Sequence, residues 1–272
     1  MTTLPTPPLP TSVPGFAKAV QPIAHTTEIK TDSEGLEVGD IKIATSNGEI
    51  PGYFAKPIHA GSYPIVLVVQ EIFGVHEHIR DVTRRLAKLG YLAVAPELFY
   101  RQGSVANLQI EAIREIVARV PDAQVLTDLD ATLAWAETHG GDSKRIAISG
   151  FCWGGRITWL YAAHQPKLKA GVAWYGRLDS ASTELQPHSP LSQAEHLKVP
   201  VLGLYGGADT GIPLETVHTF QAALAAVNSP STVHIYPDAP HAFYADYRPS
   251  YRKEAAEDGW QRLKTWLKQH GV

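Results

Sequence analysis

Short apolar runs alternate along this chain with segments of helical period from Pro64 onward. The runs occupy residues 65–69, 92–95, 146–149, 170–175, 201–205 and 233–236. Each is a nearly continuous apolar stretch, which is typical of a strand buried on both faces. Strands of this kind separated by helices predict an α/β fold with a mostly parallel central sheet and helices on both faces.

Two apolar stripes at helical spacing predict core-facing helices. They consist of Ile79, Val82, Leu86 and Leu89, and of Ala256, Trp260, Leu263 and Leu267. Residues 107–139 are expected to form two helices that break near Pro121-Asp122, with Asp122 as an N-cap.

The part of the chain before this repeat has a different pattern. Residues 40–44 and 50–55 alternate around Asn47-Gly48, which predicts a β-hairpin that opens the sheet. Residues 1–35 are proline-rich and then polar, and we interpret them as an extended arm that is either flexible or laid over the domain. Residues 36–272 are expected to form a single domain.

Composition narrows the range of partners. The 272 residues are 44% hydrophobic and 19% charged, and the net charge of −3 is spread along the chain. This balance favours a small-molecule substrate over nucleic acid or a membrane surface. One cysteine excludes an intrachain disulfide and a cysteine-rich zinc site, and together with the uncharged, proline-rich residues 1–14 it favours a cytoplasmic location. No run reaches the roughly 18 apolar residues of a membrane span.

That single cysteine is the first candidate for chemistry. Cys152 lies in Gly150-Phe151-Cys152-Trp153-Gly154-Gly155, directly after an expected strand and before an expected helix. In a nucleophile elbow a sharp strand-to-helix turn exposes the central side chain, and small neighbours are required because larger ones would clash. The helix N-terminus would also favour a thiolate. We therefore interpret Cys152 as a nucleophile.

An acid and a histidine follow two later strands. Asp209 comes after residues 201–205 and His241 after residues 233–236, so the chain order is nucleophile, acid, histidine, as in α/β-hydrolases. His241 would accept the thiol proton, and Asp209 would orient the imidazole and stabilise its charged form.

Acyl transfer also needs donors for the oxyanion. One is expected from the backbone N–H of the residue after the nucleophile, Trp153, and the other from the loop after the strand at 65–69, where we assign Ile72.

These residues resemble the dienelactone hydrolases (carboxymethylenebutenolidases), cysteine members of the α/β-hydrolase fold. The resemblance covers about residues 40–270. It rests on Gln70-Glu71-Ile72-Phe73-Gly74-Val75, the elbow, Gly207-Ala208-Asp209 and His241-Ala242-Phe243, with support from residues 90–98. It implies hydrolysis of a lactone or ester by Cys-His-Asp covalent catalysis without a cofactor. It also implies that Glu71 is a gating carboxylate, which contacts the cysteine at rest and swings away when substrate enters.

The chain departs from this family where the substrate carboxylate is held. The family has an arginine four residues after the catalytic histidine, and this position is Ala245. Arg101 and Arg177 follow expected strands and could replace it, whereas Arg114 cannot be assigned and Arg248 is the weakest of these candidates. Phe73 and Tyr175 are further substrate-binding candidates.

Two other interpretations remain open for the function. The chain could be a carboxylesterase or thioesterase for a neutral, bulkier substrate, or a non-catalytic module with Cys152 as a redox-sensing thiol. The run His76-Glu77-His78 invites a metal site, but histidines two apart at a helix start point about 200° apart. We therefore expect no metal there and assign this run to helix capping and solvent exposure.

Overall fold

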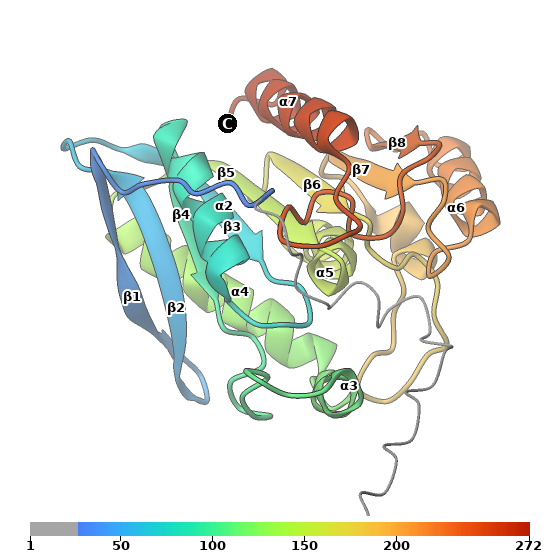
Figure 1. Ribbon diagram of the computed structural model, residues 1–272, viewed down its shortest axis with the longest axis horizontal. Coiled ribbons are helices and arrows are strands. Elements are labelled where there is room, and N and C mark those ends of the chain that lie inside the picture. The colour runs from blue at the N-terminus through green and yellow to red at the C-terminus, as the bar shows by residue number, and fades with distance from the viewer. Residues whose placement is uncertain (1–26) are drawn as a thin grey trace, which may run out of the picture.

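The computed structural model describes residues 27–272, and the expected arm at 1–26 lies outside the described residues. An eight-stranded sheet with the order β1-β2-β4-β3-β5-β6-β7-β8 runs through the domain (Figure 1). Its strands are β1 (Leu36–Thr45), β2 (Gly48–Pro57), β3 (Tyr63–Val69), β4 (Leu92–Pro96), β5 (Gly141–Phe151), β6 (Ala170–Trp174), β7 (Val201–Gly206) and β8 (Thr232–Tyr236). The β1-β2 and β2-β4 pairs are antiparallel and the others are parallel, which confirms the predicted mostly parallel sheet.

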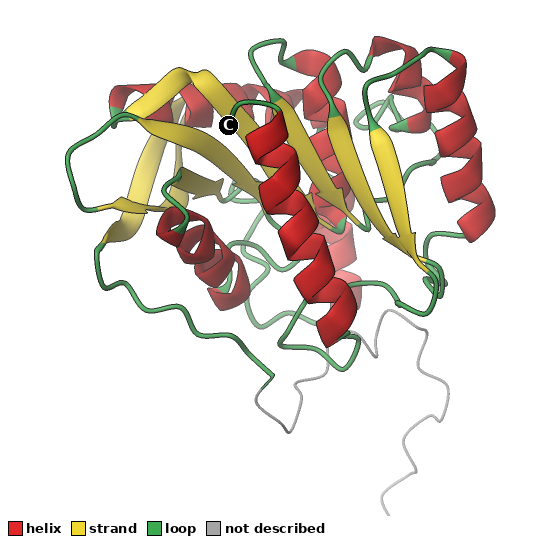
Figure 2. Ribbon diagram, turned by 90° about the horizontal axis from the view of Figure 1, so that it is seen from above, coloured by secondary structure: helices red, strands yellow, loops and turns green. Residues whose placement is uncertain are grey.

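Helices cover both faces of the sheet. They are α2 (Glu77–Lys88), α3 (Ile110–Ala118), α4 (Asp122–Thr138), α5 (Trp153–His164), α6 (Leu214–Ala226) and α7 (Lys253–Gln269), with a short 3₁₀ helix at Leu191–His196. Seen from above, α7 and α2 lie on one face, and α4 and α5 lie on the other (Figure 2). Both faces of the central strands are therefore buried, in accordance with their continuous apolar sequences.

The predicted hairpin is present, with small differences. Thr45 pairs with Gly48, so the two-residue turn is Ser46-Asn47, one residue earlier than expected. Gly48 has φ +99°, a conformation that favours glycine. β8 was expected to be buried but is half-exposed, because it is the last strand of the sheet and pairs only with β7.

Two helix predictions need correction. Leu89 was placed in the core stripe of α2, but it follows the last helical residue and is 45% exposed. The break at Pro121 is confirmed by α3 and α4, yet Asp122 is not the N-cap. It is the first residue of α4, and its carboxylate accepts two hydrogen bonds from Arg156 at 2.7 and 2.8 Å.

The described part of the N-terminal segment, residues 27–35, lies over the domain and crosses α2 (Figure 1). Thr31 donates its backbone N–H to Asp81 at 2.6 Å, and Arg84 donates to the Thr31 carbonyl at 2.8 Å. These bonds join the segment to α2. Within residues 27–272, no helix has the length and hydrophobicity of a membrane span.

Candidate active site

Cys152 stands on a strained turn between β5 and α5. Its backbone has φ 55° and ψ −113°, values that side chains seldom adopt. The turn is packed so tightly that a Cβ at Gly150 would lie 2.2 Å from the Gly154 carbonyl oxygen, and one at Gly154 would lie 2.4 Å from that of Val69. The limited space around the turn therefore requires the glycines of the elbow motif.

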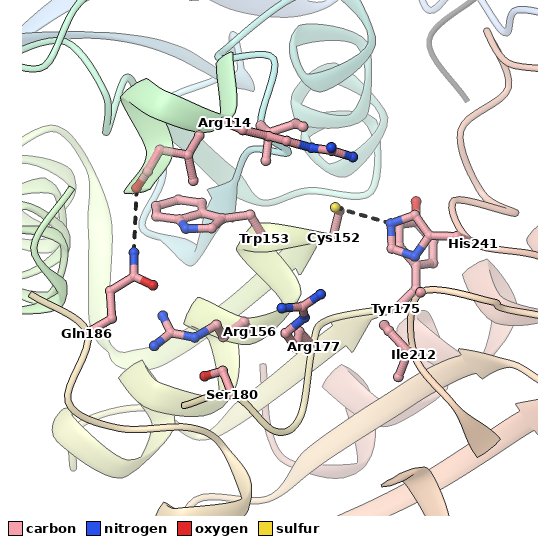
Figure 3. Close-up of a pocket in the computed structure, with 13 residues that line it drawn as sticks. Arg114, Cys152, Trp153, Arg156, Tyr175, Arg177, Ser180, Gln186, Ile212 and His241 are labelled. Carbon is pink, nitrogen blue, oxygen red and sulfur yellow. Dashed lines mark hydrogen bonds between the residues drawn. The ribbon is translucent and has the colours of Figure 1, made fainter. Parts of the chain in front are cut away.

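The structure brings Cys152, His241 and Asp209 together at the carboxyl ends of β5, β8 and β7. His241 Nε2 lies 3.2 Å from the cysteine sulfur (Figure 3), and His241 Nδ1 lies 2.7 Å from Asp209 Oδ2. The second oxygen of Asp209 accepts backbone N–H groups from Gly211 at 2.8 Å and Ile212 at 3.1 Å. A continuous hydrogen-bonded chain thus runs from the sulfur to a fixed, buried carboxylate.

The surroundings of His241 favour its protonated form. Burial alone would lower the pKa of His241, but the neighbouring sulfur of Cys152 and the carboxylate of Asp209 outweigh it and raise the pKa to about 10. This arrangement suits a thiolate-imidazolium pair at neutral pH.

Backbone strain is concentrated at this site. Among the described residues, five non-glycine residues have positive φ, and three of them surround the sulfur: Cys152, Tyr175 at 37° and Ala242 at 59°. Tyr175 follows β6 and packs its ring against that of His241, with 5.3 Å between centroids. Ala242 follows His241 directly. Such strain persists only where packing enforces it, and it is frequent at functional sites.

The two expected oxyanion donors lie at the same cavity as the sulfur. Trp153 is the first residue of α5, so its backbone N–H has no partner within the helix. Ile72 follows β3 and also lines the cavity beside Cys152.

The cavity above the sulfur has a volume of about 470 Å³. Tyr175, Arg114, Arg156 and Arg177 are among the residues that line it (Figure 3). Arg156 is held by Asp122, so its charge is already compensated. Arg114 and Arg177 are the other arginines among the described residues that line this cavity.

Glu71 is fully buried and lies in a polar cluster beside this cavity. Its Oε2 accepts hydrogen bonds from the Tyr247 hydroxyl at 2.7 Å and Arg248 Nη2 at 3.3 Å, and lies 3.4 Å from His76 Nε2. Burial would raise the pKa of Glu71, but Arg248 and His76 hold it far below its usual value. The carboxylate is thus paired with these groups, while the sulfur is paired with His241.

Arg248, the weakest arginine candidate from the sequence, is the cation beside Glu71. It is 3% exposed, and its guanidinium lies 4.5 Å from the ring centroid of Phe73 and 4.8 Å from that of Tyr247. Sequence reasoning missed this cluster because two of its members, Tyr247 and Arg248, lie 176 and 177 residues from Glu71 along the chain. The one available signal was the Tyr247-Arg248 pair shortly after His241.

Two substrate-binding candidates lie elsewhere. Arg101 does not line the cavity at Cys152 and forms a salt bridge with Asp128 at 2.6 Å. Phe73 lines a second cavity of about 640 Å³ together with Tyr247, rather than the cavity at Cys152. Ala245 is completely buried and lines neither cavity, so an arginine there would need a different local backbone.

Within the run His76-Glu77-His78, only Glu77 has the solvent exposure that we expected. His76 is the N-cap residue of α2 but caps nothing with its side chain, and its ring stacks on that of His78 at 6.0 Å. His78 is buried and contacts Asp246, whereas Glu77 pairs with Arg84. The rings lie close together because His76 precedes the helix, so helical spacing does not apply to it.

Comparison with known proteins agrees with this geometry. The pattern of the "Dienelactone hydrolase family" matches residues 50–271. The "Putative carboxymethylenebutenolidase" of Methylorubrum extorquens is 58% identical over 262 residues, 95% of this chain and 90% of that protein. The protein of the same name from Yersinia pestis is 55% identical over 253 residues, 91% of this chain and 94% of that protein.

A solved structure extends the comparison to the fold. The "Putative Dienelactone Hydrolase" of Klebsiella pneumoniae has a TM-score of 0.85 and 54% identity, covering 86% of this chain and 99% of that one. The fold is therefore that of the α/β-hydrolases, as the order of nucleophile, acid and histidine predicted. The chain belongs to the dienelactone hydrolase family, whose members hydrolyse carboxylic esters and lactones.

Proposed function

We propose that this protein hydrolyses a lactone or carboxylic ester by covalent catalysis, with Cys152 as the nucleophile. The observation that carries the proposal is the hydrogen-bonded chain from Cys152 through His241 to Asp209 at the base of a cavity. A buried structural cysteine would need neither the strained turn nor the charged partner.

The groups present account for each step. The Cys152 thiolate, whose proton is on His241, attacks the substrate carbonyl, and the oxyanion is held by the backbone N–H groups of Ile72 and Trp153. The carbon-oxygen bond of the ester breaks, and the His241 imidazolium gives its proton to the departing oxygen. Water, deprotonated by His241, then attacks the thioester and releases the carboxylic acid.

Glu71 acts in this scheme as a gate. Next to the sulfur, its carboxylate would disfavour the thiolate through like-charge repulsion. Paired with Tyr247 and Arg248, it leaves the sulfur to His241. Movement between these two positions would keep the nucleophile unreactive until substrate is bound.

The preferred substrate carries a carboxylate. Arg114 and Arg177 line the cavity from different elements, and guanidinium groups bind carboxylates through paired hydrogen bonds. The name of the curated relatives describes a butenolide, an unsaturated lactone with a carboxymethylene arm. Arg177 would supply the cation that the family places at the position of Ala245.

The test uses a dienelactone carboxylate and its methyl ester as matched substrates, followed by loss of ultraviolet absorbance. Mass spectrometry of the quenched reaction should detect an acyl group on Cys152, and Cys152→Ala should abolish both turnover and acylation. Turnover without acylation of Cys152 would refute covalent catalysis. A methyl ester cleaved as fast as the acid would refute the carboxylate preference and favour a neutral-ester carboxylesterase.

A further inference from the structure

Asp246 is a buried acid in the segment that joins His241 to α7, and it belongs to none of the groups assigned above. It is 2% exposed. Its Oδ1 lies 3.1 Å from His78 Nδ1, and its Oδ2 accepts a hydrogen bond from Arg85 Nη2 at 2.5 Å. Both partners are on α2, so this one side chain fixes the segment to that helix.

The N-terminal segment also contacts Asp246, through its residues Thr27 and Ile29. The Ile29 backbone N–H lies 3.4 Å from its Oδ2, and the Thr27 hydroxyl donates to its backbone carbonyl. Arg85 donates in addition to the Ile29 carbonyl at 3.4 Å. Asp246 thus joins three parts of the chain that are distant in sequence.

The residues that follow Asp246 are the ones that hold Glu71. Tyr247 and Arg248 both bond Glu71 Oε2, and they can do so only while the backbone at 246–248 keeps its place. This backbone is a tight turn, in which Ala245 N–H donates to the Ala242 carbonyl and Arg248 N–H to the Ala245 carbonyl, each at 3.0 Å. A shift at Asp246 would therefore be passed directly to the Glu71 partners.

We propose that Asp246 is a positioning residue that keeps Glu71 away from the Cys152 sulfur by fixing Tyr247 and Arg248 to α2. The inference rests on the proposed gating role of Glu71. Tyr247 and Arg248 are the contacts that Asp246 would keep in place against the Glu71 carboxylate. When the contacts of Asp246 with α2 are lost, the Glu71 carboxylate moves toward the Cys152 sulfur, and its negative charge disfavours the thiolate.

The experiment compares Asp246→Asn with Asp81→Asn. Asp81 is a matched control because it is also buried, also accepts from Arg85, and also holds the N-terminal segment, through Thr31. Its link to the segment that holds Glu71 is indirect and runs through Arg85, which keeps its bond to Asp246 in this variant. Each substitution is isosteric and places an amide beside Arg85, so both should lower the melting temperature by a similar amount.

The readout is the rate of Cys152 alkylation by iodoacetamide as a function of pH, which needs no substrate. We expect Asp246→Asn to move the midpoint of this curve to higher pH and to lower the rate at pH 7 about tenfold. Asp81→Asn should leave both unchanged. Equal curves for the two variants would overturn the inference, since the effect would then be one of general stability.

Removing the Glu71 carboxylate tests the route of the effect. In a Glu71→Gln background, Asp246→Asn should no longer move the midpoint, because no carboxylate remains to be released. A shift that persists would overturn the inference. Should Asp246→Asn not fold, Tyr247→Phe removes the strongest Glu71 contact directly and must move the midpoint in the same direction. An unchanged alkylation curve for Tyr247→Phe would likewise overturn the inference. Failure of the proposed function would be detected separately, as the absence of acyl-Cys152.

Discussion

Replacing Asp209 by asparagine should nearly abolish turnover while leaving the fold intact. Asp209 Oδ1 accepts two backbone N–H groups, and its Oδ2 accepts from His241 Nδ1. In Asp209→Asn the amide oxygen would keep the backbone bonds, so the NH₂ group would face His241. The imidazole would then have to present Nδ1 as an acceptor, with its proton on Nε2, where it can no longer take the proton of Cys152.

A histidine held in the wrong tautomer lowers the rate of comparable triads about 10³- to 10⁴-fold, equivalent to about 4 to 5.5 kcal/mol in the activation free energy. The assay is kcat/KM for the dienelactone carboxylate, with the melting temperature measured alongside. Asp238→Asn is the control, because it removes the same charge from an exposed position in the loop before His241. A loss below about tenfold with the fold retained would refute the assigned role of Asp209.

Three further predictions address packing, protonation and substrate charge. Gly154→Ala should reduce the free energy of unfolding by about 2 to 3 kcal/mol in urea titrations, because its Cβ would meet a backbone carbonyl at 2.4 Å, whereas Gly39→Ala, with its nearest contact at 3.5 Å, should have little effect. The pKa of His241 is raised to about 10 in the folded protein, so its stabilising contribution should be fully present below about pH 6.5 and disappear as the pH rises through 10; nuclear magnetic resonance titration of the ring that gave a value near or below 6.5 would contradict this. Arg177→Ala should raise KM for the carboxylate substrate about tenfold and leave KM for its methyl ester unchanged, while Arg101→Ala, whose partner is Asp128, should alter neither; equal effects of the two variants would exclude a substrate contact by Arg177.

The parts of this protein that sequence predicts well are those set by local rules. An elbow needs glycines beside its nucleophile because the turn leaves no space, and the spacing of Gly150 and Gly154 around Cys152 reveals that requirement directly. The acid and histidine follow from chain order, since the carboxyl ends of parallel strands meet at one edge of the sheet.

The Glu71 cluster was not predictable in the same way. Arg248 has no periodic or motif context, and its partner becomes apparent only when the segment after His241 meets Glu71 in the loop after β3. Arg101 and Arg177 have equivalent positions in the sequence, each a few residues beyond a strand. In the structure Arg101 forms a salt bridge with Asp128 on α4, whereas Arg177 lines the cavity. The sequence predicted that His78 is exposed, because its buried partner Asp246 is 168 residues away along the chain.

The tight contacts of the elbow bear on how this enzyme can change its substrate. A Cβ added at Gly154 or at Gly155 would lie 2.4 Å from a backbone carbonyl oxygen of a neighbouring strand. The backbone around the nucleophile therefore tolerates almost no substitution at these positions. The cavity wall around Arg177 and Gln186, by contrast, comes from a largely exposed loop after β6. Directed evolution toward new esters should therefore gather its mutations in that loop, and a library that randomises the elbow should yield mostly unfolded protein.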